Sequence, residues 1–185
     1  MRVCILSDSH DNRRLLDHAA EDAKARGAEA ILHCGDVVAP TTLRVLKRFA
    51  LPVHVIHGNN AGDLFAMHAL MHEADSRVHY HGQDAAIQLG GRRIFLVHYP
   101  HYAAAMALTG DYDVVCCGHD HRTSIREVSN VKGGSTWLVN PGTVGGVGKP
   151  PTYLLADLDA MRFSIHDVPT AQGEACNTPP ASTHT

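Results

Sequence analysis

Groups of potential metal ligands recur along the chain, and each group follows directly after a run of apolar residues. Asp8 and His10 come after the first run, and Asp36 comes after the second. Later runs are followed by further ligands, namely Asn59, His98, His119 and His121. Carboxylate, imidazole and amide oxygen together suit borderline divalent metals, and they form no all-thiolate cage. Such groups after five successive apolar runs predict one site where the carboxyl ends of strands converge.

The spacing within these groups favours shared ions over isolated side chains. Asp8 and His10 stand two positions apart, and side chains two apart on a strand point to the same side. His119 and His121 show the same spacing after a buried run and a glycine, which is unusual for a plain loop. Asp36 has two carboxylate oxygens that can bridge two cations. An ordinary turn or helix start would explain any one group, but not the ordered series.

Alternating strands and helices must position the first three groups. Apolar runs predict strands over residues 1–6, 28–33 and 53–57. Helical spacing predicts a helix that is capped by Asn12 and ends near Arg26, and a second helix that ends near Phe49. This alternation is typical of parallel strands joined by right-handed crossovers.

The remainder of the chain is richer in strands. Helices are predicted over residues 63–72 and 102–108, and strands over 78–81, 85–89, 92–97, 113–117, 124–128, 135–139, 153–158 and 162–168. Gly90 and Gly91 between two of these strands are a strong hairpin signal. The pattern predicts an α/β fold with two packed sheets and helices outside them.

Length and composition limit the classes of protein to which the chain can belong. Its 185 residues predict one domain over residues 1–168, followed by a flexible tail over 169–185 that is rich in Ala, Thr, Pro and Ser. The net charge of −3 provides no basic field, which argues against stable nucleic-acid binding. No apolar run approaches the roughly 20 residues that span a bilayer.

The start of the chain and its cysteines indicate the cellular setting. The first strand begins almost at Met1, which leaves no room for a signal peptide, so a cytoplasmic location without membrane contact is expected. The five cysteines are odd in number and lack CxxC spacing, which indicates reduced thiols. Most of the 15 histidines have no ligand context and are expected to be structural or surface residues.

In their order, the ligand groups resemble the motifs of the calcineurin-like metallophosphoesterase superfamily, and its short single-domain bacterial and archaeal phosphodiesterases in particular. Residues 7–12 resemble the Ser-Asp-x-His-x-Asn motif of that branch, and residues 140–143 are similar to its Asn-Pro-Gly-Ser turn. The resemblance covers about residues 1–168. It implies a four-layer α/β/β/α sandwich with two mixed β-sheets, in agreement with the predicted strands and helices.

The resemblance also implies two divalent metal ions about 3.5–4 Å apart. The residues implied for the first metal are Asp8, His10, Asp36 and His121. Those implied for the second are Asp36, Asn59, His98 and His119, with Asp36 bridging. Manganese is the expected metal, with Fe, Ni, Co and Zn as alternatives, because mixed N/O ligands do not select between them. The implied reaction is hydrolysis of phosphodiesters, and also of phosphomonoesters, by in-line attack of a hydroxide that bridges the metals.

The residues expected nearest the reaction are Asp36, Asn59, Asn60 and His101, and the chain departs from the family pattern at the last two. Many members carry a histidine where Asn60 stands, which is thought to protonate the leaving group or bind phosphate. Asn cannot act as an acid, so the best rates are expected on esters with good leaving groups. The family usually reads His-Gly-His where this chain reads His98-Tyr99-Pro100-His101. His101 either reaches the site, as acid or phosphate contact, or is a surface histidine.

A non-catalytic scaffold of the same fold is the alternative interpretation, since a retromer subunit with this fold works through protein contacts after losing metal-binding histidines. All seven expected ligand positions are filled here, which favours the enzyme. A nuclease would need more length and a basic face. The expected partner is a small phosphate-ester substrate, and preference for diester or monoester stays open. A homodimer is a generic expectation.

Overall fold

The computed structural model describes residues 1–170, so almost all of the predicted tail over 169–185 lies outside the described residues. The strands are β1 (Arg2–Leu6), β2 (Ala30–His33), β3 (Val53–Val55), β4 (Val78–Tyr80), β5 (Asp84–Leu89), β6 (Arg92–Val97), β7 (Val114–Cys116), β8 (Thr123–Ser129), β9 (Ser135–Pro141), β10 (Thr152–Asp157) and β11 (Arg162–Asp167). The helices are α1 (Arg13–Ala25), α2 (Leu64–Ala69) and α3 (Pro100–Thr109), with 3-10 segments η1 (Pro40–Phe49) and η2 (Leu70–His72).

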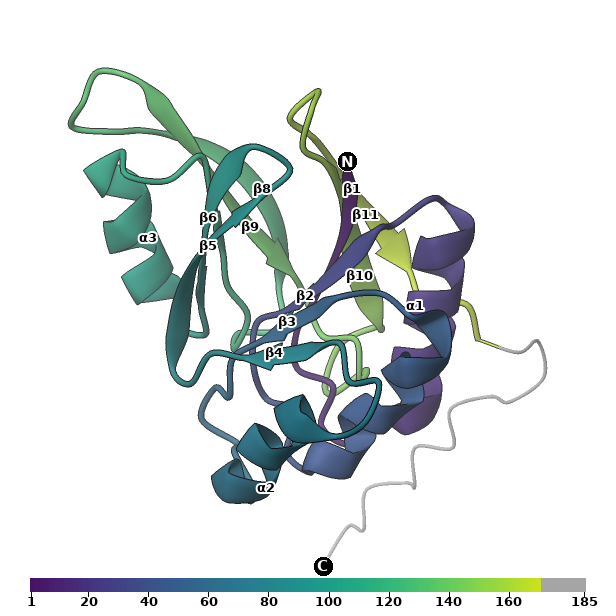
Figure 1. Ribbon diagram of the computed structural model, residues 1–185. Helices are drawn as coiled ribbons and strands as arrows, with labels where there is room; N and C mark the ends of the chain where they lie inside the picture. The colour runs from purple at the N-terminus through teal and green to yellow at the C-terminus, as the bar shows by residue number, and fades with distance from the viewer. Residues whose placement is uncertain (171–185) are drawn as a thin grey trace, which may run out of the picture.

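The strands form two mixed sheets, as predicted (Figure 1). The first has the order β11-β10-β1-β2-β3-β4, in which β1 to β4 run parallel and β10 and β11 are antiparallel to their neighbours. The second has the order β5-β6-β7-β9-β8, with parallel β6, β7 and β9 between antiparallel edges. Within each sheet, the loops that follow the parallel strands therefore leave at one edge.

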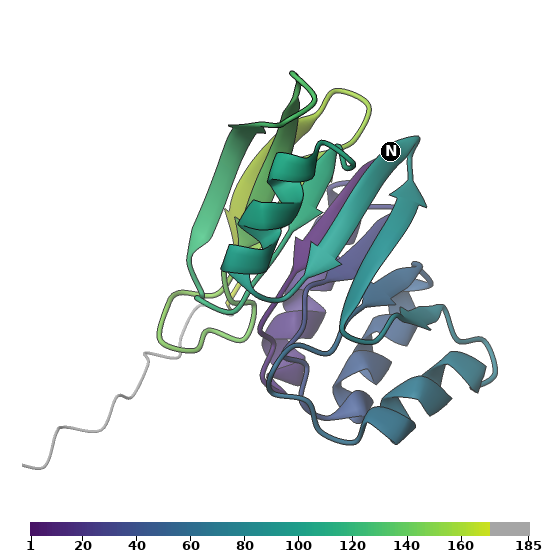
Figure 2. The same cartoon turned by 90° about the vertical axis from the view of Figure 1, so that its left-hand side faces the viewer.

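The two sheets pack face to face, with α1, η1 and α2 outside the first and α3 outside the second (Figures 1 and 2). The side chains of β1 alternate accordingly. Val3 and Ile5 lie in the apolar layer between the sheets, whereas Cys4 and Leu6 lie in the layer beneath α1 and η1. Phe95 belongs to a third apolar layer under α3. These three layers produce the four-layer α/β/β/α order that was expected.

The helix starts follow from prolines and side-chain caps. Asn12 caps α1 as predicted, because its side-chain oxygen accepts the backbone N–H of Leu15 (3.2 Å). The second predicted helix is a 3-10 helix that begins at Pro40, since the fixed φ of proline suits the first helical position. For the same reason, α3 begins at Pro100 rather than at residue 102.

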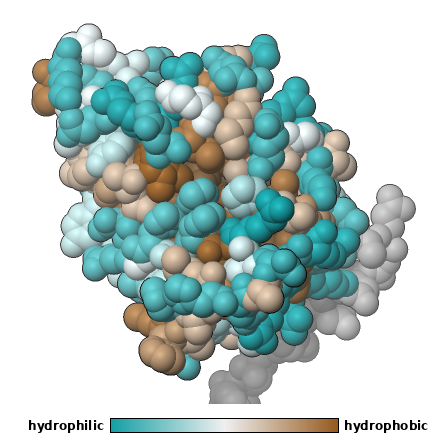
Figure 3. Space-filling view, viewed as in Figure 1, coloured by the Kyte–Doolittle hydropathy of each residue, from teal (hydrophilic) through white to brown (hydrophobic). Residues whose placement is uncertain are grey.

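The segment predicted as one helix over residues 63–72 consists of α2 and η2. Asp63 caps α2, because its side chain accepts the backbone N–H of Ala66 (2.9 Å). Leu64 and Phe65 at the start of α2 are exposed, with 41% and 85% of their surface accessible. Figure 3 shows apolar residues at the lower edge of the molecule, where Figure 1 places α2. No helix within residues 1–170 combines the length and apolar character that a membrane crossing requires.

Candidate metal centre

The ligand-bearing loops lie against one another at the edge where the parallel strands of both sheets end. The backbone N–H of Asp8 donates to the carbonyl oxygen of Gly35, which joins the loops after β1 and β2 (3.0 Å). The N–H of Gly118 donates to the carbonyl oxygen of His98, which joins the loops after β7 and β6 (3.0 Å). The N–H of His119 donates to Oδ2 of Asp8 (3.0 Å) and so connects the two sheets.

Four of the predicted ligands form a first group from the loops after β1, β2 and β7, namely Asp8, His10, Asp36 and His121. Nε2 of His10 lies 3.8 Å from Oδ1 of Asp8 and 3.7 Å from Oδ2 of Asp36. Nε2 of His121 lies 3.4 Å from Nε2 of His10 and 3.3 Å from Oδ1 of Asp8. Separations of this size are expected between atoms that can each reach one cation over about 2.0–2.2 Å.

The second group consists of Asp36, Asn59, His98 and His119, from the loops after β2, β3, β6 and β7. Oδ1 of Asn59 lies 2.9 Å from Nε2 of His98 and 2.8 Å from Nδ1 of His119. Oδ1 of Asp36 lies 3.3 Å from Nε2 of His98. Asp36 therefore faces the second group with Oδ1 and the first group with Oδ2, as a bridging carboxylate must.

Hydrogen bonds behind two of the rings direct their lone pairs toward the centre. Nδ1 of His98 donates to the carbonyl oxygen of Cys34, and Nδ1 of His121 donates to the carbonyl oxygen of Val147, both at 2.8 Å. Because a carbonyl oxygen only accepts, each Nδ1 carries a proton, and in its neutral form each ring presents a lone pair on Nε2. These lone pairs face carboxylate oxygens, an arrangement that a shared cation stabilises.

The environment of the Asp8 carboxylate indicates whether these residues fit a metal ion. Its Oδ1 is buried and has no hydrogen-bond partner within residues 1–170. Burial raises the pKa of the Asp8 carboxyl above its ordinary value, because the charged form loses its water. A buried acceptor left without a donor costs about 1–3 kcal/mol, and more when it is charged. A divalent cation between Asp8 and His121 would remove that cost, so the residues present fit a metal.

Asp36 has the opposite environment. Its Oδ1 accepts the backbone N–H groups of Asn59 and Asn60, both at 2.8 Å, and its Oδ2 accepts Nδ2 of Asn60 at 2.6 Å. Burial raises the pKa of this carboxyl, but hydrogen bonds from His98 and Asn60 outweigh burial and hold the pKa well below its ordinary value. Asp36 is therefore ionised at neutral pH, with an oxygen toward each group.

The backbone at five ligand residues is left-handed, a conformation that residues other than glycine rarely adopt. The φ angle is positive at Asp8 (55°), His10 (42°), Asp36 (58°), His119 (72°) and His121 (56°). Each such residue costs on the order of 1–3 kcal/mol, so the hydrogen bonds between the loops must hold it in place. Strain gathered at one place is typical of functional sites.

Two glycines allow the loops to approach each other. A Cβ atom on Gly118 would lie 1.9 Å from Oγ of Ser7 and 2.6 Å from Oδ2 of Asp8. A Cβ atom on Gly58 would lie 2.4 Å from Oδ1 of Asp36. No side chain fits at either position without displacing a carboxylate of the centre.

Asn60 and His101, the remaining two predicted residues, are placed differently. Asn60 touches the centre directly through its hydrogen bonds to Asp36. His101 is exposed at the second residue of α3, and its ring packs against Tyr99 and Tyr102 with centroids 5.6 and 4.2 Å away. A catalytic role for His101 stays a prediction.

Two further residues, His33 and Asn140, support the loops of the centre without being among the predicted ligands. His33 is fully buried, accepts the N–H of Gly35 on Nδ1 (3.3 Å) and contacts Oγ of Ser9 through Nε2 (3.1 Å). Burial lowers the pKa of His33 to about 3. Asn140, noted only as part of a motif, donates from Nδ2 to the carbonyl oxygen of Gly118 (3.0 Å). The contacts with Ser9 and Gly118 join residues more than 20 positions apart, so no local sequence pattern predicts them. His33 could still have been noticed, because it is a polar residue at the end of the apolar strand β2.

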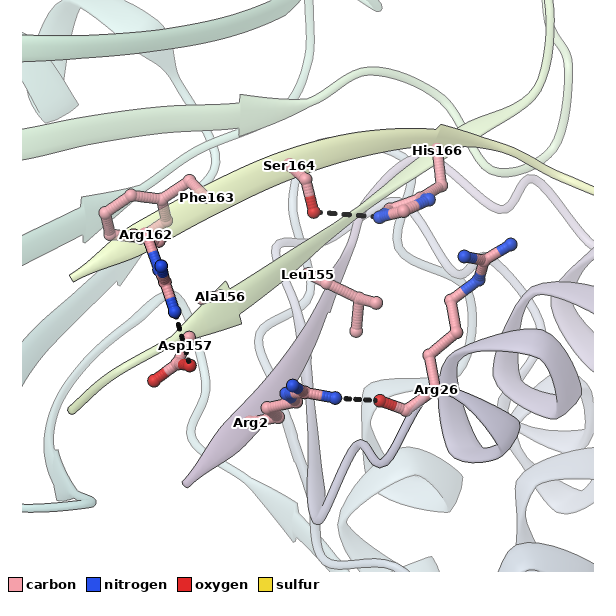
Figure 4. Close-up of a pocket in the computed structure, with 9 residues that line it drawn as sticks. All are labelled: Arg2, Arg26, Leu155, Ala156, Asp157, Arg162, Phe163, Ser164 and His166. Carbon is pink, nitrogen blue, oxygen red and sulfur yellow. Dashed lines mark hydrogen bonds and ion pairs between the residues drawn. The ribbon is translucent and has the colours of Figure 1, made fainter. Parts of the chain in front are cut away.

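Two cavities differ in their relation to the centre. One of about 370 Å³ is lined by His98 and by aromatic side chains at the start of α3. A larger one of about 540 Å³ lies beside Arg2, at the opposite end of β1 (Figure 4). There Arg2 donates to the carbonyl oxygen of Arg26 (2.8 Å), and Arg162 pairs with Asp157 (3.9 Å). Only the smaller of these two cavities shares a residue with the candidate centre.

Comparison with known proteins agrees with this geometry. Residues 1–161 match the calcineurin-like phosphoesterase superfamily domain. A phosphodiesterase of Methanocaldococcus jannaschii is 26% identical over 166 residues, which cover 88% of this chain and 96% of that protein.

Solved structures share the fold. A structure described as a novel archaeal phosphodiesterase has a TM-score of 0.78 and 22% identity, over 90% of this chain and 99% of that chain. A phosphoesterase from E. coli has a TM-score of 0.64 and 19% identity, over 91% of this chain and 100% of that chain. The mixed α/β architecture with two sheets is therefore common to these proteins.

Proposed function

Since the chain belongs to the calcineurin-like phosphoesterase superfamily, we propose that it hydrolyses phosphodiesters with the help of two divalent metal ions. Phosphomonoesters are the second substrate class of this proposal, and manganese is the first metal to test. The similarity to a phosphodiesterase over 88% of the chain supports the diester. The net charge of −3 favours a small ester over a nucleic acid as substrate.

One observation carries the proposal. Within the described residues Oδ1 of Asp8 has no hydrogen-bond partner, and it faces Nε2 of His121 at 3.3 Å. In the neutral ring that nitrogen presents a lone pair, because Nδ1 donates to the carbonyl oxygen of Val147. The second group repeats the arrangement with Asp36 and His98. In each group a carboxylate oxygen therefore faces an imidazole nitrogen, and the ionised carboxylate of Asp36 joins the two groups. This arrangement supports a pair of cations rather than a single one.

The residues of the chain divide the work around these cations. When bound, two divalent metals supply the charge that activates a water molecule and neutralises the phosphoryl oxygens. Asp36 holds the two groups in register, since hydrogen bonds from Asn59 and Asn60 fix its oxygens. The bond from His98 to Cys34 fixes that ring and makes Nε2 a stronger base. Asn60 is not an acid, so the leaving group must depart with little protonation.

The proposal is tested by measuring hydrolysis of bis-p-nitrophenyl phosphate and p-nitrophenyl phosphate after metal removal and after refilling with manganese. We expect manganese-dependent turnover, faster on the diester, and about two metal ions per chain by elemental analysis. Asp36→Asn should lose both bound metal and turnover. Asp111→Asn is the matched control, because Asp111 pairs with Lys132 on the surface and surface pairs contribute little.

Absence of turnover with every metal, despite measured metal binding, would refute the enzyme and favour the scaffold interpretation. A monoester rate above the diester rate would reverse the order of substrate classes. The cytoplasmic location and the homodimer stay predictions, which cell fractionation and sedimentation of the purified chain would test.

A further inference from the structure

The cavity of about 370 Å³ begins at the candidate metal centre. His98 lines it while its Nε2 lies 3.3 Å from Oδ1 of Asp36. Gly58, the residue before Asn59, also lines it. A phosphate ester held at the centre therefore has space on this side for one of its two organic arms.

The walls of this cavity are suited to a planar apolar group. Phe95 and Met106 line it from β6 and α3, and Tyr102 lines it with 52% of its surface still accessible. Aromatic rings and a thioether gain about 0.5–1.5 kcal/mol from an aromatic partner beyond simple burial. An alkyl arm of one or two carbons would leave most of this surface without contact.

The edge of the cavity selects against negative charge. Asp84, the first residue of β5, lines it together with Gln83 and His57. A carboxylate at the edge repels a second anionic group on the substrate, whereas an uncharged arm can donate hydrogen bonds to Asp84 or Gln83. The favoured arm is therefore both aromatic and uncharged.

Tyr99 forms the boundary between cavity and centre. Its ring centroid lies 4.8 Å from that of His119 and 5.8 Å from that of Tyr102. Pro100 follows it at the first position of α3 and restricts the backbone there. The aromatic ring of Tyr99 therefore lies between the imidazole of His119 at the centre and the phenol of Tyr102 in the cavity.

We propose that this cavity binds the retained arm of a phosphodiester, and that this arm is a planar, uncharged aromatic group. The inference rests on the proposed function, because it places the phosphate at the candidate metal centre.

The kinetic test compares two diesters with the same leaving group, phenyl p-nitrophenyl phosphate and ethyl p-nitrophenyl phosphate. We expect kcat/KM to be about tenfold higher for the phenyl ester, an effect within the range of aromatic contacts. Tyr102→Ala should reduce this ratio to about threefold or less. Leu108→Ala is the matched control, because Leu108 is exposed on α3 and does not line the cavity.

A binding test is independent of turnover. The methyl groups of the five methionines are labelled for NMR in the zinc-loaded protein, and the Met106 signal is assigned from Met106→Leu. Phenylphosphonate should move the Met106 signal, and methylphosphonate should not.

The two tests separate failure of this inference from failure of the proposed function. Turnover with equal kcat/KM for the two diesters would overturn the aromatic arm and leave the phosphodiesterase intact. No turnover with either diester would refute the function, and the NMR result would then decide on the cavity. In that case a Met106 signal that phenylphosphonate does not move would overturn the inference as well.

Discussion

Asp8→Asn should stabilise the metal-free protein and weaken the metal-loaded one. In the metal-free protein the ionised carboxylate is buried, its Oδ1 has no donor among residues 1–170, and burial raises the pKa of the carboxyl. An amide of the same shape can keep the bond from the His119 N–H on its oxygen and donate from its nitrogen to Nε2 of His121, now 3.3 Å away. The substitution therefore removes the cost of a buried charged acceptor and adds a hydrogen bond to His121.

The magnitude follows from the cost of an unpaired buried acceptor. Removing about 1–3 kcal/mol raises the melting temperature by roughly 2–4 °C per kcal/mol for a chain of this size, which is about 2–12 °C in chelator. With metal bound, the wild-type protein should instead melt at a higher temperature than the Asp8→Asn variant. At a hundredfold excess over Kd, binding stabilises the wild-type protein by about 2.7 kcal/mol, and the variant gains much less because a charged ligand is lost.

Thermal unfolding in chelator and in manganese measures both effects. Asp36→Asn is the matched comparison, because Asp36 accepts three hydrogen bonds at 2.6–2.8 Å and its pKa is held well below its ordinary value. The same chemical change should therefore destabilise the metal-free protein at that position. A melting temperature in chelator that falls in Asp8→Asn, or that rises in Asp36→Asn, would refute the electrostatic reasoning for the site.

Three further predictions concern packing, pH and the leaving group. Gly118→Ala should lower the free energy of unfolding by about 1–3 kcal/mol and weaken metal binding at least tenfold, because its Cβ would displace Asp8. Gly134→Ala should do neither, because the nearest atoms to its Cβ would be 3.7 Å away. Equal melting temperatures of the two variants would contradict this prediction. The pKa of His33 is about 3 in the folded state against about 6.5 when unfolded, so stability should fall as pH drops from about 6.5 toward 3, by up to roughly 1.4 kcal/mol per unit. His33→Gln should flatten that slope in melting curves, and an unchanged slope would assign the acid sensitivity elsewhere. Because Asn60 cannot protonate a leaving group, aryl phosphodiesters should react about 100-fold or more faster than dialkyl ones, and comparable rates would show that another acid acts.

Local sequence patterns predict the parts of the centre that lie at strand ends. The runs before Asp8, Asp36 and His98 are apolar because these strands are buried on both faces, and the polar residue that ends each run is then conspicuous. The same patterns predict two mixed sheets, since strand and helix alternate first and strands dominate later.

The remaining features depend on contacts between distant segments, which local patterns do not record. Nothing near His121 in sequence indicates that Val147 accepts its Nδ1 proton and so directs Nε2 to the centre. The cavity depends on Phe95 and Met106 meeting across β6 and α3. The 3-10 geometry of η1 also differs from expectation, because apolar spacing alone does not distinguish it from an α-helix.

The link between Asp8 and the His119 N–H spans 111 positions, and this has a consequence for synthesis. At about 5–20 residues per second, a ribosome releases the second of these residues roughly 6–20 seconds after the first. The strand before Asp8, β1, can also pair with β10 only after β10 has been synthesised, because Ile5 pairs with Leu154. The nascent chain therefore contains Asp8 and His10 well before His119 and His121 have been synthesised. The proposed set of seven ligands is complete only after residue 121 has been synthesised.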